Sequence, residues 1–134
     1  MMRFVLKTLP VVALALVAAG CSSITNLTPS KLPRNANGLY QIEAAWQTRE
    51  QSMIPGSLTP QVMVGSELYP MRPVPTVEGR FEAFVPVPAG QNLLRYQFKF
   101  DFQNYRMNVR RPNSYMSPGY TLEVSNKLDR KSVV

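Results

Sequence analysis

Few side chains in this sequence can do chemistry, and the main candidates are one cysteine and a set of carboxylates. Cys21 is the only cysteine and histidine is absent, which excludes an intrachain disulfide, His-dependent nucleophile pairs and His-dependent zinc sites. Glu82 and Asp101 are the best candidates for a hydrolytic carboxylate pair. The acidic candidates all fall on the polar phase of expected strands: Glu43, Glu67, Glu82, Asp101 and Glu123. We therefore expect no enzyme, no metal site and no cofactor.

The residues before Cys21 have the anatomy of an export signal. Arg3 and Lys7 give a positive start, and an apolar run covers residues 9–19. This run is shorter than the roughly 20 residues that a membrane-spanning helix needs. Small residues then lead to the cysteine in the sequence Val17-Ala18-Ala19-Gly20-Cys21, which resembles the lipobox of bacterial lipoproteins, although Ala18 stands where that family usually carries leucine.

The lipoprotein resemblance implies cleavage before Cys21, a diacylglyceryl group on its thiol and often a third chain on its amine. Two or more acyl chains hold a protein stably on a bilayer. In such families an aspartate after the cysteine favours the inner membrane, whereas here Ser22 and Ser23 follow. We expect a lipid-anchored protein of the cell envelope in the outer membrane. The alternative is an ordinary secretory leader followed by a free thiol.

Three arginines and two aromatic residues are candidates for binding. Arg106, Arg110 and Arg111, with Lys99 nearby, could meet anionic lipid or glycan, or could form a solvated rim. The net charge of +7, to which Arg3 and Lys7 contribute, also favours anionic surroundings. Trp46 is in phase with core positions, whereas Phe84 is out of phase and could lie on an exposed patch or beneath a loop.

The elements that position these residues are strands, because apolar residues alternate with a period of two. Rows of inward positions are expected at 40–46, at 62–68, at 81–87 and at 94–102, with a final strand at 120–124 and a weaker one at 105–109. Residues 88–92 suit a hairpin in which Gly90 can take a positive φ. Prolines and glycine predict a loop over 112–119. The proline-rich stretch 69–75 could dock in a partner's groove, or could cross between sheets.

This pattern predicts an all-β, antiparallel β-sandwich of one domain that follows a cleaved N-terminal signal helix. We expect a signal peptide at 1–20, the lipidated cysteine with a tether or first edge strand at 21–38, the sandwich at 39–126 and a charged flexible tail at 127–134.

Residues 79–90 (GRFEAFVPVPAG) and 96–101 (YQFKFD) resemble a hairpin of early-set immunoglobulin-like domains, a group that includes glycogen-binding modules. The resemblance implies an immunoglobulin-like fold. It also raises carbohydrate binding, but starch-binding members carry tryptophans that stack on sugar rings, and Trp46 is the only tryptophan here.

The sequence thus predicts a membrane-anchored, non-catalytic interaction or accessory module. Its expected partners are membrane lipid through Cys21 and an envelope protein or glycan, and not nucleic acid, which an exported protein does not meet. A carbohydrate-binding module that tethers glycan at the envelope is the alternative, and a small hydrolase is the third hypothesis.

Overall fold

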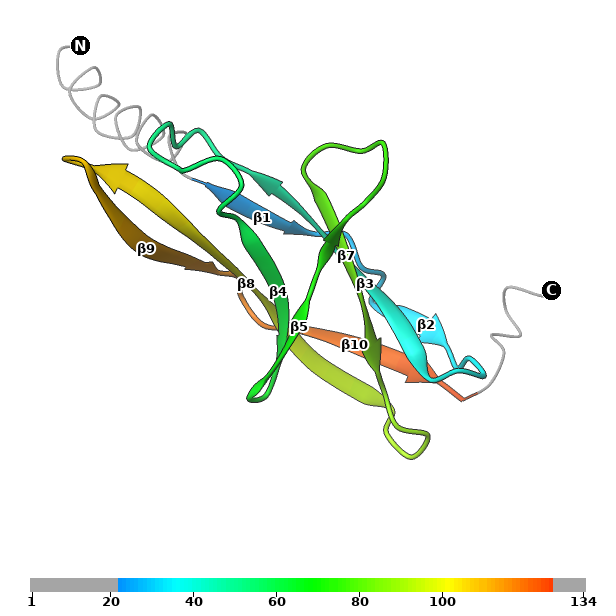
Figure 1. Cartoon of the computed structure of the whole chain (residues 1–134). Coiled ribbons are helices and arrows are strands. Elements are labelled where there is room, and N and C mark those ends of the chain that lie inside the picture. The colour runs from blue at the N-terminus through cyan, green and yellow to red at the C-terminus, as the bar shows by residue number, and fades with distance from the viewer. Residues whose placement is uncertain (1–21, 127–134) are drawn as a thin grey trace, which may run out of the picture.

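The computed structural model describes residues 22–126, and Cys21, the leader and residues 127–134 lie outside this range. The described chain is all β, with two sheets packed face to face (Figure 1). Its strands are β1 Ser23–Asn26, β2 Lys31–Pro33, β3 Leu39–Gln47, β4 Thr59–Val64, β5 Glu67–Pro70, β6 Arg72–Pro73, β7 Arg80–Pro86, β8 Leu93–Arg106, β9 Val109–Met116 and β10 Tyr120–Ser125.

The strand order defines the fold. One sheet has the order β1-β3-β7-β6 and the other has the order β2-β10-β8-β4-β5, with β9 pairing β8 beyond the end of β10. This is the A-B-E-D and G-F-C arrangement of immunoglobulin domains, with β5 in the place of C′. The predicted immunoglobulin-like sandwich is therefore confirmed. All strand pairs are antiparallel except β2 with β10, which run parallel.

The N-terminal segment contributes to both sheets. β1 pairs with β3, and after a kink at Pro29 the chain continues as β2 beside β10. Pro29 suits the kink because proline has no amide hydrogen to donate to a ladder. Thr28 holds the preceding turn to β3, since its Oγ1 donates to the Glu43 carbonyl over 3.1 Å. The body of the sandwich thus begins at Ser23, so residues 22–38 include edge strands of the sandwich.

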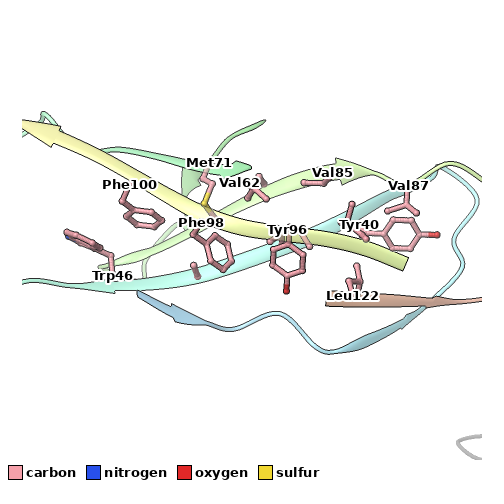
Figure 2. Packing of buried hydrophobic residues seen from close by; sticks show 14 of the residues in the cluster. Tyr40, Trp46, Val62, Met71, Val85, Val87, Tyr96, Phe98, Phe100 and Leu122 are labelled. Atoms are coloured by element: carbon pink, nitrogen blue, oxygen red, sulfur yellow. The ribbon is translucent and has the colours of Figure 1, made fainter. Parts of the chain in front are cut away.

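The core lies between the sheets, where the predicted alternation places it. Leu94, Tyr96, Phe98, Phe100 and Phe102 on β8 are all buried. Tyr40, Ile42, Ala44 and Trp46 on β3 face them from the other sheet, and Figure 2 shows the rings of Trp46 and Phe100 side by side in this layer. A strand gathers such rows on one face because its side chains alternate.

Two connections differ from the sequence prediction. Residues 88–92 do not form a hairpin, since β7 and β8 belong to different sheets, and Gly90 does not have a positive φ. Residues 88–92 do form a turn, but this turn connects one sheet to the other. The single row expected at 62–68 is two strands, β4 and β5, joined at Gly65-Ser66, and Leu68 is exposed.

The proline-rich stretch 69–75 crosses between the sheets, which is one of the two alternatives considered above. β5 lies at the edge of one sheet and β6 at the edge of the other, with Met71 buried between them. The Met71 amide donates to the Pro60 carbonyl over 2.9 Å. Proline is suited to these positions because an edge strand needs no donor on its free side.

Candidate functional site: the β8–β9 hairpin and the N-terminal pole

The most prominent feature outside the compact body is the hairpin of β8 and β9. Its register runs from Lys99 opposite Met116 to Arg106 opposite Val109. Met107 and Asn108 form the turn, with φ of 51° and 62°, which is the geometry of a type I′ turn. Figure 1 shows the hairpin projecting past the other strands at the end of the sandwich where β1 begins.

The prediction of a loop over residues 112–119 is wrong, because most of these residues belong to β9. Pro112 and Ser114 lie inside β9, and only residues 117–119 interrupt the pairing before β10. Pro112 is tolerated because Gln103, opposite it, uses its amide and carbonyl on the other side, with Ser57 Oγ at 3.1 Å and the Ile54 amide at 2.8 Å. Residues 117–119 form a bulge, one residue longer than the facing part of β8.

The three candidate arginines all lie on this hairpin and are exposed, but they do not share one face. Arg106 follows the inward phase of β8, and Arg111 shares it because Tyr115, in the same phase, contacts Trp46. Arg110 lies on the opposite face. Lys99 is not part of this group, since its Nζ pairs with Asp101 Oδ2 at 2.8 Å. The arginines thus surround the hairpin end and do not form a flat patch.

Exposed apolar side chains accompany these arginines. Met107 is 97% exposed, and Tyr105 and Val109 are 50% and 51% exposed. The alternation of Tyr105, Met107 and Val109 predicted a strand of their own, whereas Met107 lies at the tip of the hairpin. The signal that could have located the turn is Asn108, because asparagine tolerates the left-handed conformation. We call residues 105–111 the hairpin tip.

A chain of polar contacts joins Asn104, beside the outer end of this hairpin, to the N-terminal end of the described chain. Ser22 is buried and its Oγ lies 2.7 Å from Thr48 Oγ1. Thr48 Oγ1 accepts the Glu50 amide over 3.1 Å, and Glu50 Oε1 accepts Asn104 Nδ2 over 3.1 Å. Asn104 itself is buried, and its Oδ1 has no partner in the described structure. Ser22 and the hairpin therefore belong to one pole of the sandwich.

The two aromatic candidates have different surroundings. Trp46 is buried in the core, stacked on Phe100 with ring centroids 5.1 Å apart, so its ring is not available to a ligand (Figure 2). Phe84 is exposed, as its phase suggested, and the Arg72 guanidinium lies 5.6 Å from its ring centroid. Phe84 is on the β1-β3-β7-β6 sheet, whereas the hairpin extends the other sheet. These candidates do not form one site with the arginines.

A shallow hollow of about 810 Å³ lies beside the hairpin, lined by the 54–59 loop and by residues such as Asp101, Gln103 and Arg110. Burial alone would raise the pKa of the Asp101 carboxyl, but hydrogen bonds from Lys99, Ser114 and Gln61 outweigh it and hold the pKa below its ordinary value of 3.8. The one aromatic residue in the lining, Phe102, is buried. The hollow thus offers no ring on which a sugar could stack.

Glu82 and Asp101, the best candidates for a carboxylate pair, do not lie together in the structure. Glu82 belongs to the β1-β3-β7-β6 sheet and Asp101 to the other. Glu82 is also buried, contrary to the solvated position expected, because Gln41 Nε2 donates to it over 3.1 Å and Arg72 lies 3.9 Å away. Glu43, opposite Glu82 in the register, is paired with Arg80. Each carboxylate therefore has a basic or amide partner.

Within residues 22–126, no cluster of acidic side chains is arranged to hold a metal ion. The same range contains no helix long and apolar enough to cross a membrane.

The fold and this pole define an immunoglobulin-like sandwich with a protruding, basic hairpin. A solved structure of murine CRIg is similar with a TM-score of 0.41 and 11% sequence identity, over 79% of this chain and 99% of that one. The immunoglobulin-like fold is assigned from the strand order alone. No family model matches the chain, and no curated relative matches it either.

Proposed function

We propose that this chain is a lipoprotein of the cell envelope, anchored in the outer membrane through lipid on Cys21, and that its sandwich is a non-catalytic interaction module. The observation that carries the proposal is the sequence Val17-Ala18-Ala19-Gly20-Cys21 at the end of the apolar run. The burial of Ser22, the residue next to Cys21, indicates where such an anchor would meet the sandwich. Its contact with Thr48 means that an acylated Cys21 would join the folded body with no linker between them.

The proposed mechanism is a high local concentration. A domain fixed to a bilayer meets its neighbours in an effectively intramolecular way, so a weak contact becomes an occupied one. The short connection at Ser22 supports this because it would hold one pole of the sandwich at the membrane and direct the opposite pole, where β8 begins at Leu93, into the envelope space.

A non-catalytic role is consistent with the charged side chains of the described chain. Glu43 and Glu82 face arginines, and Asp101 accepts hydrogen bonds from Lys99 and Gln61. Asp101 is a poor general acid, because these hydrogen bonds stabilise its ionised form and lower its pKa.

The alternative function, a carbohydrate-binding module of early-set kinship, has less support. Ring stacking requires exposed aromatic faces, but Trp46 is buried and the ring of Phe84 lies against Arg72.

Metabolic labelling tests the proposal. The full chain and the variant Cys21→Ser are expressed in a Gram-negative host supplied with an alkyne fatty acid, and membranes are separated by density. We expect label on the native chain in the outer-membrane fraction, release by detergent and not by salt, and no label on Cys21→Ser. Unlabelled native protein that salt releases would contradict the proposal.

A further inference from the structure

We propose that the hairpin tip, residues 105–111, is a second membrane contact that inserts into the interface of an anionic phospholipid bilayer. This inference rests on the proposed anchoring at Cys21 and adds to it a surface that selects the lipid. Three observations carry it: the composition of the tip, the conformation of Met107 and the position of the tip relative to Ser22.

The tip combines positive charge with exposed apolar side chains. Arg106, Arg110 and Arg111 lie in this stretch, and residues 102–116 contain no aspartate or glutamate. Asp101, on the same strand, is engaged by Lys99, and Glu50 accepts a hydrogen bond from Asn104. Basic residues that surround exposed Tyr, Met and Val are typical of a surface that lies in a membrane interface, where the apolar groups enter and the charges meet lipid phosphates.

The conformation of Met107 indicates that its side chain has a purpose outside the folded body. A left-handed backbone is unfavourable for residues with a Cβ, apart from Asn and Asp, yet Met107 has φ of 51°. Its side chain is 97% exposed and so gains nothing from packing within the described chain. Strain of this kind is found where function requires a particular side chain. A flexible apolar side chain at the extremity of the hairpin suits insertion among acyl chains.

The tip lies at the pole from which the N-terminal chain leaves the sandwich. The contacts from Ser22 through Thr48 and Glu50 to Asn104 join the first described residue to the part of β8 that directly precedes the tip. The turn lies three residues beyond Asn104, which corresponds to about 10 Å along a strand. Cys21 directly precedes Ser22, so an anchor at Cys21 would bring the tip to the same bilayer surface. This continuity favours a membrane over a protein as the occupant.

Depth-dependent fluorescence quenching tests the inference with the full-length lipidated protein purified from membranes. Met107→Trp places a reporter at the tip, and Leu93→Trp places one at the opposite end of β8, where Leu93 is 49% exposed. Each protein is reconstituted in vesicles of brominated phosphatidylcholine, with or without phosphatidylglycerol. Val109→Trp is the second tip reporter if the turn does not accept the indole.

We expect strong quenching of the tip reporter in the anionic vesicles, weak quenching in neutral ones, and none for Leu93→Trp. Addition of Arg106→Gln and Arg111→Gln should weaken tip insertion by about 30-fold, since each basic residue near an anionic surface contributes about fivefold. The charge-matched control, Lys31→Gln with Arg95→Gln, should leave the quenching unchanged.

The inference is overturned if the tip reporters are quenched no more than Leu93→Trp. It is also overturned if their emission shifts to the blue without quenching, which would indicate burial against a protein surface such as a second copy. Flotation of the same samples shows whether a negative quenching result comes from the tip or from a missing lipid anchor. Protein that floats with neutral vesicles has its lipid anchor, and protein that floats only with anionic vesicles has the tip contact and lacks the anchor.

Discussion

The indole of Trp46 lies stacked on the ring of Phe100, with their planes inclined by 25°. Trp46 Nε1 is buried and has no hydrogen-bond partner among residues 22–126. The indole thus contributes apolar contact and no polar bond.

Replacement of Trp46 should therefore depend on ring size. We expect Trp46→Ala to lower the free energy of unfolding by about 3–5 kcal/mol, as for other large aromatic residues in cores. Trp46→Phe should cost less than about 1.5 kcal/mol, because a ring remains and no hydrogen bond is lost. Urea titration measures both. Phe84→Ala, at an exposed ring, is the control and should be nearly neutral. A loss for Trp46→Phe as large as that for Trp46→Ala would contradict this dependence on ring size.

Much of the core could be predicted from the sequence, because its signal is local. Alternation over residues 94–102 fixes which side chains of β8 are buried, whatever the strand pairs with. The choice of partner is a different matter. The turn residues at 88–92 are the same whether the chain folds back in one sheet or crosses to the other, so the hairpin prediction was wrong. Pairing between strands depends on packing of the whole domain, and the sequence of a single strand does not determine its partner.

The candidate site was predicted only in part for the same reason. The arginines were identified by type, but their separation onto two faces depends on the register of β8 and β9. Pro112 suggested a loop because proline breaks a central strand, whereas an edge strand accepts it. Glu82 was expected in solvent because its phase is polar. Its burial by Arg72 and Gln41 comes from residues on β6 and β3, which no local pattern reveals.

The free edge of β9 should be protected against pairing with another chain. Pro112 has no amide hydrogen to offer on that side, and the Ser114 amide already donates to Asn113 Oδ1 over 2.8 Å. Edge strands commonly use such devices against aggregation. We expect Pro112→Thr to self-associate in a concentration-dependent way, measured by analytical ultracentrifugation. Pro55→Thr, in the loop before β4, is the control and should sediment like the native chain. Unchanged sedimentation of Pro112→Thr would count against edge protection by proline.

The bulge at Ser117 should be important for stability. Ser117 Oγ accepts the amide of Phe98 over 2.8 Å in a buried position. Ser117→Ala leaves that amide unpaired, and we expect a loss of about 1–3 kcal/mol in the free energy of unfolding. Ser66→Ala, in the exposed β4–β5 turn, should change it by less than about 0.5 kcal/mol. Equal denaturant midpoints for the two variants would mean that water replaces the hydroxyl.

Asp101 should make stability depend on pH in the acid range. Because its pKa is lowered in the folded state, its contribution is present above the unfolded-state pKa of about 3.9 and is lost as pH falls through the lower folded pKa. Asp101→Asn should therefore lose less stability than the native chain as the pH drops below about 4. Gln61→Met removes one donor, at 2.9 Å, and should move the carboxyl titration in NMR spectra upward. A native Asp101 that titrates at or above 3.8 would contradict this account.

The early switch of the chain from one sheet to the other has a mechanical consequence. β1 is hydrogen-bonded to β3 in one layer, and β2 follows in the second layer. Traction applied at Ser22 would run along β1 and load its bonds to β3 in shear. These bonds are perpendicular to the strand, so they would have to rupture together and not one after another. The sandwich would therefore resist unfolding by force applied at Ser22.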